Sequence, residues 1–171
     1  MPVAAPSLAL QALLRSAART AGLYDSAPAY SGLTPPAKGL YAAAASSLHP
    51  LLVGLASDRE AEQVPADPRY FLGALGGVSA ADAERLALPF PSQEVDPYRG
   101  LLPHLDVASA RARALLALAQ GRARVVVASA AALLPRLSPP ERLLAQSIEL
   151  AEGVEVPPQA LRALLASAGF G

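Results

Sequence analysis

The chain has 171 residues, and its 14 basic and 14 acidic side chains give a formal net charge of zero at neutral pH. A balanced surface of this kind gives no electrostatic footprint for nucleic acid or anionic lipid, so we expect no appreciable binding of double-stranded DNA by the chain itself. Cysteine is absent, which excludes disulfides, thiolate catalysis and cysteine metal sites.

Three further features indicate a cytoplasmic protein without a metal site. No apolar run reaches the length of a membrane span. The first fourteen residues are apolar but no basic region precedes them, so they do not match a signal peptide. His49 and His104 lie far apart in the sequence, and neither has an acidic residue three or four positions after it.

The first third of the chain predicts two helices and a buried strand. Leucines interleaved with arginines indicate a helix over 7–20, which Gly22 can end. Residues 27–33 could form a short strand. The two prolines that open the segment 35–48 suit the first turn of a second helix. The continuous apolar run Leu51–Ala56 is typical of a strand buried on both faces.

The middle third continues with helical segments, a second strand and a loop. Ser57, followed three residues later by Glu60, forms a capping box that predicts a helix start. A helical pattern resumes over 69–75, and Leu86–Phe90 is a second apolar run of strand length. The proline-containing segment 92–105 predicts a structured loop, because apolar side chains are interspersed through it.

The next predicted elements are a long helix and a third strand. Asp106 is the predicted cap of the helix, with Arg111 and Arg113 away from its apolar stripe. Val125–Ser129 is the strongest strand signal in the chain. The stripe consists of Val107, Ala110, Ala114, Leu115 and Leu118.

The last part of the chain predicts three more helices and one possible strand. Helices are expected over 130–137, from Ser138 onward, and over 157–168 with Gly169 as the C-terminal cap. Residues 147–151 could form a strand. Because strands alternate with helices and are apolar on both faces, we expect an α/β fold with a parallel sheet flanked by helices on each side.

One segment has the outline of a phosphate-binding loop. Gly32, Thr34 and Lys38 lie where such a loop after a strand would place a glycine, a hydroxyl and a lysine. However, the prolines at 35 and 36 lack the N–H groups that would bind phosphate, and Gly39 offers no hydroxyl for magnesium. We therefore interpret the segment as a helix start with a decayed nucleotide site, and predict no cofactor in this chain.

Two clusters of charged residues are candidates for a functional site. The first could perform acid–base chemistry, but a loop and a helix cap explain it better. The second could form a basic strip, but a solvated helix face explains it better. No serine nucleophile motif is present, so we predict no catalytic residue. The first cluster is Glu94, Asp96, Arg99, His104 and Asp106, and the second is Arg111, Arg113, Arg122 and Arg124.

Four segments in the same order resemble the amino-terminal part of the bacterial transcription-repair coupling factor, or Mfd. They are SGLTPPAKGLYAAAASSLHPLLVGLASDREAE, LPFPSQEVDPYRGLLPHLDVASARARALLAL, ARVVVASAAALLPRLSPPE and GVEVPPQALRALLASAGF. Together they cover roughly Tyr30 to Gly171, and Phe170 stands where the family usually has a tyrosine. Each segment is moderately specific, and their shared order is what makes the resemblance.

The resemblance implies a fold similar to the first domain of UvrB, degenerate relative to P-loop NTPases. It implies three parts: an amino-terminal helix over 1–26, a UvrB-like α/β domain over 27–146, and the start of a UvrA-binding type of subdomain over 147–171. ATP and magnesium would act in motor domains of a longer parent protein. UvrA, RNA polymerase and DNA would be partners of that parent, whose other domains would contact this one.

No UvrA-contact residue can be carried onto this chain, because the family's arginine-bearing contact segment follows the position of Phe170. Two alternatives stay open at this point. The chain could be an active nucleotide-hydrolysing α/β enzyme that uses Lys38, or a free-standing adaptor for repair or transcription proteins.

Overall fold

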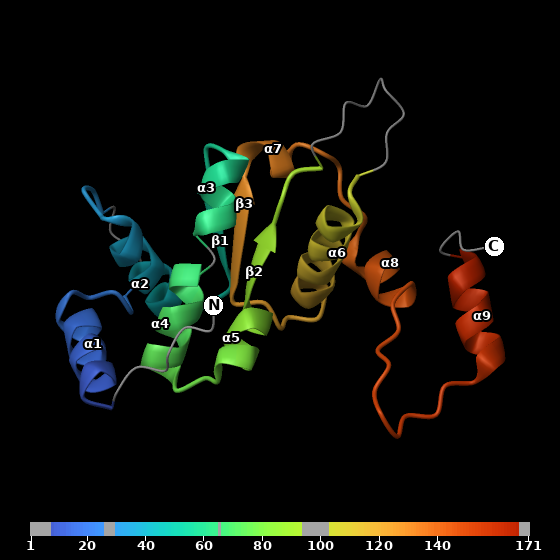
Figure 1. The fold of residues 1–171 in the computed structure, drawn as a ribbon, viewed down its shortest axis with the longest axis horizontal. Coiled ribbons are helices and arrows are strands. Elements are labelled where there is room, and N and C mark those ends of the chain that lie inside the picture. Colours follow the sequence, from blue (N-terminus) through green and yellow to red (C-terminus); the bar gives the residue numbers. More distant parts are fainter. Residues whose placement is uncertain (1–7, 26–29, 65, 94–102, 168–171) are drawn as a thin grey trace.

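The computed structural model describes residues 8–25, 30–64, 66–93 and 103–167. Three parallel strands form a sheet in the order β1-β3-β2, with helices on both faces (Figure 1). The strands are β1 (Leu51–Leu55), β2 (Ala87–Phe90) and β3 (Val125–Ser129). The helices are α1 (Leu8–Thr20), α2 (Pro35–Ala45), α3 (Asp58–Gln63), α4 (Ala66–Gly76), α5 (Ala80–Leu86), α6 (Leu105–Ala119), α7 (Ala130–Leu133), α8 (Pro140–Ala145) and α9 (Pro158–Ser167). The predicted α/β class with a parallel sheet is therefore confirmed.

Strand β3 is the centre of the fold. All five of its residues are buried, as the run of three valines predicts. Val125 and Val127 point to one face of the sheet, where they pack with small residues of α2, α3 and α5 and with Leu72 of α4. Val126 and Ala128 point to the other face, which α6 covers through Ala114. The sheet thus has one core on each face, and both β2 and β3 contribute residues to each of them.

The prediction that the run Leu51–Ala56 forms a strand buried on both faces is wrong. β1 is an edge strand that pairs only with β3 among the described residues. Its burial alternates along the strand, because Leu51, Val53 and Leu55 pack on the first core while Leu52 is 56% exposed. The helix α6 lies over β2 and β3 and leaves this face of β1 uncovered.

Other expected elements differ in extent. The helix predicted over 130–137 ends at Leu133, because Pro135, two residues later, has no N–H to continue the helical hydrogen bonds. Residues 147–151 form no strand, and no neighbouring strand lies beside them in the described sheet. Residues 30–33 are irregular, whereas residues 27–29 of the strand suggested for 27–33 lie outside the described residues, as does Gly169.

Several local predictions are confirmed. The Ser57 side chain accepts a hydrogen bond from the Glu60 N–H at 3.3 Å, which is the first half of a capping box. Gly22 follows α1 with a φ of 66°, a backbone conformation that glycine adopts readily and that stops a helix. Helix α5 was not predicted, although Ser79 caps it by accepting a hydrogen bond from the Asp82 N–H at 3.1 Å.

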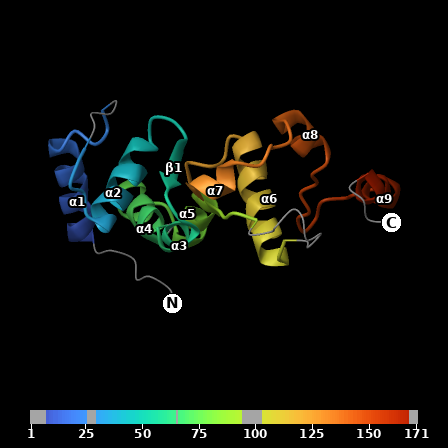
Figure 2. The same cartoon turned by 90° about the horizontal axis from the view of Figure 1, so that it is seen from above.

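The carboxyl-terminal helices lie at the margin of the fold. α8 packs against α6, whereas α9 lies apart from the sheet in both views (Figures 1 and 2). No residue of α9 is buried. The division of the chain at residue 146 stays a prediction.

Candidate functional site

A network of polar side chains joins the carboxyl ends of the three strands. Asp58 is the first residue of α3, directly after the cap Ser57 that follows β1. Its carboxylate accepts hydrogen bonds from the hydroxyl of Ser129 at 2.5 Å and from the hydroxyl of Ser92 at 2.8 Å. The backbone N–H of Ser92 donates a third hydrogen bond at 3.3 Å. We call this set, Asp58, Ser92 and Ser129, the serine–aspartate cluster.

The sequence places these residues together because each follows an apolar strand. In a parallel sheet, all strands end at the same edge, where ligands of open α/β sheets usually bind. Ser129 ends β3 and caps α7 by accepting a hydrogen bond from the Ala132 N–H at 3.0 Å. Ser92 lies two residues after β2. The serine–aspartate cluster is thus at the position where a catalytic site would be sought first.

The electrostatics of the cluster favour a charged and unreactive carboxylate. The hydrogen bond from Ser129 lowers the pKa of Asp58 most, and the bonds from Ser92 lower it further against the opposing effect of burial. A carboxylate with a lowered pKa is a weaker general base than an ordinary one. The Ser129 hydroxyl donates its only proton to Asp58 and accepts from the Ala132 N–H, so its single donor is used within the fold.

A buried arginine holds the same edge of the sheet from the side of α6. Arg111 is 5% exposed and donates hydrogen bonds to the carbonyls of Pro91 at 2.7 Å and Ala132 at 3.2 Å. Its guanidinium lies 3.9 Å from the ring centroid of Phe90, within range of a cation–π contact. Burial lowers the pKa of Arg111, although an arginine remains charged in proteins. The prediction that Arg111 lies off the buried face of its helix is therefore wrong.

Together, Asp58 and Arg111 form a structural clamp. Asp58 connects the segment after β2 to the end of β3, and Arg111 connects that same segment to α7. Their partners are hydroxyls and carbonyls of the fold itself. The chemistry of the arrangement is therefore that of satisfied buried polar groups and not that of an activated nucleophile.

The residues of the suspected phosphate-binding loop do not converge on a cavity. Gly32 has a φ of 72° in the segment before α2, and Thr34 is the N-cap of α2 without a side-chain capping bond. Lys38 is exposed on the helix, and the two prolines occupy its first turn. Gly39 has a different purpose, because a Cβ there would lie 2.4 Å from the Cβ of Asp67 on α4.

The structure describes only two of the five residues of the charged cluster around residue 100. Glu94, Asp96 and Arg99 lie outside the described residues. His104 is the N-cap of α6, and its imidazole accepts a hydrogen bond from the Asp106 N–H at 3.3 Å. The prediction that Asp106 is the cap is wrong by two positions, because the helix begins at Leu105. Both side chains are highly exposed.

The four arginines after residue 110 do not form a basic strip. Arg111 is buried, and Arg124 donates to the Ser46 carbonyl at the end of α2 at 3.3 Å. Arg122 forms an exposed ion pair with Glu149 at 2.8 Å, which raises the pKa of Arg122 and lowers that of Glu149. Arg113 is exposed on α6. Only Arg113 and Arg122 border the same groove, whereas Arg111 and Arg124 are bonded to backbone carbonyls of other segments.

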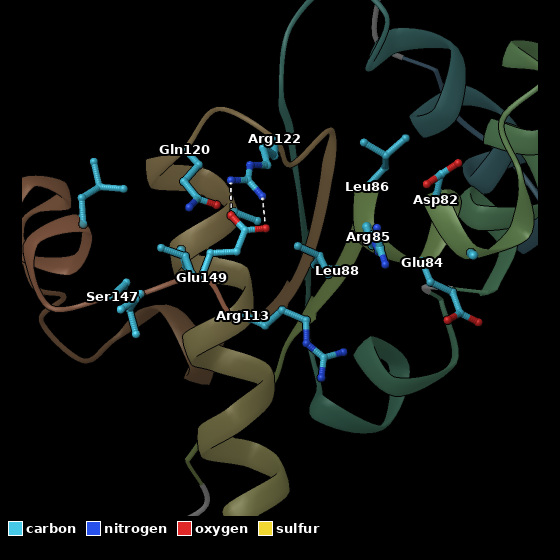
Figure 3. Close-up of a pocket in the computed structure, with 15 residues that line it drawn as sticks. Asp82, Glu84, Arg85, Leu86, Leu88, Arg113, Gln120, Arg122, Ser147 and Glu149 are labelled. Carbon is cyan, nitrogen blue, oxygen red and sulfur yellow. Dashed lines mark hydrogen bonds and ion pairs between the residues drawn. The ribbon is translucent and has the colours of Figure 1, made fainter. Parts of the chain in front are cut away.

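A groove of about 1000 Å³ lies beside β2, between α5, α6 and the segment after α8. Figure 3 shows the Arg122–Glu149 pair in this groove, with Arg85 and Arg113 also extending from the walls. The groove has three arginines and three carboxylates among its lining residues, so its formal charge is balanced. The charged lining residues are Arg85, Arg113, Arg122, Asp82, Glu84 and Glu149.

Within the described residues, no group of three or more histidine, cysteine, aspartate or glutamate side chains is arranged to hold a metal ion. None of the described helices is both long and apolar enough to cross a membrane. The serine–aspartate cluster was not predicted from the sequence. A usable signal was present, because a serine or aspartate follows each of the three apolar runs within two residues.

Comparison with known proteins gives no relative for this chain. No family model, no curated protein and no solved structure matches it. The resemblance to transcription-repair coupling factors therefore rests on the four sequence segments alone.

Proposed function

We propose that the chain is a non-catalytic α/β module of a transcription-repair coupling factor, an ATP-dependent DNA translocase that releases stalled RNA polymerase and recruits UvrA for nucleotide excision repair. The observation that carries the proposal is the order of the four family-like segments, which span roughly Tyr30 to Gly171. ATP hydrolysis, polymerase binding and DNA translocation would belong to other domains of the parent. The module would contact those domains.

The chemistry of the described residues supports a module without catalysis. The Asp58 carboxylate, at the carboxyl ends of the strands, accepts hydrogen bonds from two serines at the same edge of the sheet. Lys38 is exposed on a helix whose first turn holds two prolines, which have no N–H to offer a phosphate. These features support the decayed nucleotide site over an enzyme that uses Lys38.

Apolar side chains exposed at the surface support a role in contacts with other protein domains. Leu134 of the segment after α7 is 83% exposed, and α9 keeps none of its residues buried. Surface leucines are common singly, but a whole helix without buried residues has nothing to hold it against the domain. In the proposed parent, other domains would cover this surface.

Calorimetric titration with ATP and magnesium tests the non-catalytic part of the proposal. We expect no saturable heat with the wild-type chain, and no change in Lys38→Ala. Titration with inorganic phosphate is the control, because an isolated lysine would bind phosphate and ATP equally weakly. Micromolar ATP binding that disappears in Lys38→Ala would support the enzyme instead.

The genomic sequence that follows the codon for Gly171 tests the family. We expect it to continue into a polymerase-binding module and helicase motifs. An unrelated continuation, or a stop codon without those motifs elsewhere in the gene, would favour a free-standing adaptor. The two experiments are independent, because a non-catalytic chain is compatible with both a coupling factor and a free-standing adaptor.

A further inference from the structure

The arginines of the groove beside β2 differ in whether a carboxylate already holds them. Arg122 donates to both carboxylate oxygens of Glu149, at 3.3 and 2.8 Å, in the bidentate geometry that arginine forms with carboxylates and phosphates. Among the described residues, Arg85 and Arg113 form no ion pair, although both extend from the walls of the groove (Figure 3). The groove thus offers guanidinium groups to a further anion.

A second arginine acts on the same carboxylate through its charge. The pKa of Glu149 is lowered first by the hydrogen bond and the charge of Arg122, and then, against the opposing effect of burial, by the charge of Arg85. The charge of Arg113 contributes nothing comparable. Arg85, in the last turn of α5, and Arg122, after α6, therefore form one positive site that Glu149 occupies. We call these two residues the arginine site.

The other two carboxylates that line the groove do not neutralise the arginine site. Asp82 accepts a hydrogen bond from the Ser79 hydroxyl at 2.7 Å, at the amino end of α5. Neither Asp82 nor Glu84 forms an ion pair with an arginine of the described chain. Without Glu149, the arginine site therefore keeps two positive charges with no carboxylate bonded to either.

Glu149 belongs to a segment that few other polar contacts hold in place. We call residues 147–149, which follow α8 and line the groove, the strap. Ser147 is bonded back to α8 through both its N–H and its hydroxyl. The N–H groups of Ile148 and Glu149 donate no hydrogen bond to any described residue. Within the described structure, the Arg122–Glu149 pair is therefore the polar contact that holds the strap against the groove.

We propose that the arginine site binds an oxyanion, and that Glu149 on the strap is its internal occupant. A phosphate or carboxylate ion in the place of Glu149 offers the same pair of acceptor oxygens to Arg122. Its binding releases the strap from the groove and frees the segment after α8 to move. Both side chains of the pair are more than half exposed, and an ion pair of this kind is weak enough to exchange.

Electron paramagnetic resonance of a spin label beside the strap tests the proposal on the full chain. The chain has no cysteine, so Ala151→Cys gives a single labelling position two residues after Glu149. At low salt and neutral pH, we expect Glu149→Gln to raise the ratio of mobile to immobile label about two- to fivefold, the range open to an exposed ion pair. Glu152→Gln, an exposed carboxylate close by, is the control and should leave the ratio unchanged. Circular dichroism should be the same for all variants.

The arginine variants separate the arginine site from the rest of the groove. Arg122→Gln should release the label as Glu149→Gln does, and the double variant should be no more mobile than either single one, because both remove the same contact. Arg85→Gln should have a smaller effect. Arg113→Gln, on the opposite wall, is the matched arginine control and should have none.

Titration with anions at constant ionic strength tests the ligand. Sodium phosphate should release the label more than sodium chloride does, with a midpoint at about millimolar concentration or above, because Glu149 competes from the same chain. Sodium acetate, titrated alongside, distinguishes a carboxylate site from a phosphate site. A label equally mobile in the wild type and Glu149→Gln, or phosphate and acetate that both act no more strongly than chloride, would overturn the proposal.

Discussion

Asp58 shows how one residue at the end of a strand can hold three segments together. Its carboxylate is bonded to Ser129 and Ser92 and would leave two hydroxyls without an acceptor if it were lost. Unsatisfied buried polar groups cost more than the net gain of a hydrogen bond. The residue that most resembles a catalytic acid in position is therefore best understood as structural.

Asp58→Asn tests this role. We expect it to lower the free energy of unfolding by about 1–3 kcal/mol at neutral pH, because the amide cannot accept from both serines with the same strength. Glu62→Gln, an exposed carboxylate of the same helix, is the control and should have little effect. Urea titrations of the two variants beside the wild type give the measurement, and equal stability of all three would contradict the role.

The pH dependence follows from the direction of the Asp58 pKa. Because folding lowers this pKa, the stabilisation is fully present above the pKa of the unfolded state and is lost as pH falls through the folded-state value. The stability difference between wild type and Asp58→Asn should accordingly shrink on acidification. Urea titrations across the acidic range measure it, and a difference that grows toward low pH would be inconsistent with a lowered pKa.

Arg111 and Arg113 provide a comparison between two arginines on one helix. Arg111→Ala removes both hydrogen bonds to the Pro91 and Ala132 carbonyls and the contact with Phe90. We expect a loss of about 2–4 kcal/mol, since the carbonyls become unsatisfied and a cavity forms. Arg113→Ala, at an exposed position, should change stability by no more than about 0.5 kcal/mol. Thermal melts decide it, and similar effects of the two would be evidence against the clamp.

At the scale of elements, α2 and α4 pack closely against each other, and a glycine makes this packing possible. A Cβ at Gly39 would lie 2.4 Å from the Cβ of Asp67 and 3.1 Å from its carbonyl carbon. The glycine that had weakened the case for a phosphate site is thus explained by packing. Small residues on α2, including Ala42 and Ala43, complete the same close contact with the core.

Gly39→Ala should destabilise the chain although alanine is the better helix former. The propensity gain of about 1 kcal/mol is opposed by overpacking of about 1–3 kcal/mol, because α4 backbone would have to move. Gly54→Ala is the matched control, since its added methyl meets nothing within 4 Å. Denaturant midpoints compare the two, and a stabilised Gly39→Ala variant would mean that α2 and α4 are less tightly packed than described.

At the scale of the whole molecule, stability is concentrated in the segments from α2 to α7, which supply the two cores of the sheet. The two cores lie on the faces of β3, and the helix at the carboxyl end adds no buried residue to either. A segment with so few buried apolar contacts is expected to open locally at little cost.

Deletion of residues 150–171 tests that distribution. We expect the shortened chain to unfold in one transition with nearly the same midpoint as the full chain, because the Arg122–Glu149 pair and the α6–α8 contact are kept. The measurement is thermal unfolding followed by circular dichroism. A midpoint lower by more than a few degrees, or loss of cooperativity, would show that α9 stabilises the domain.

The sequence by itself determined the parallel α/β class, the positions of the three strands and most helix starts. The reason is that apolar runs, caps and prolines act over a few residues, as at Val125–Ser129 and Ser57. Only the tertiary structure decided that β1 is an edge, that Arg111 is buried and that Gly39 serves packing. Strand order, the covering of each face and the partners of polar groups depend on segments distant in sequence, such as Asp58 and Ser129, 71 positions apart, and no local pattern encodes them.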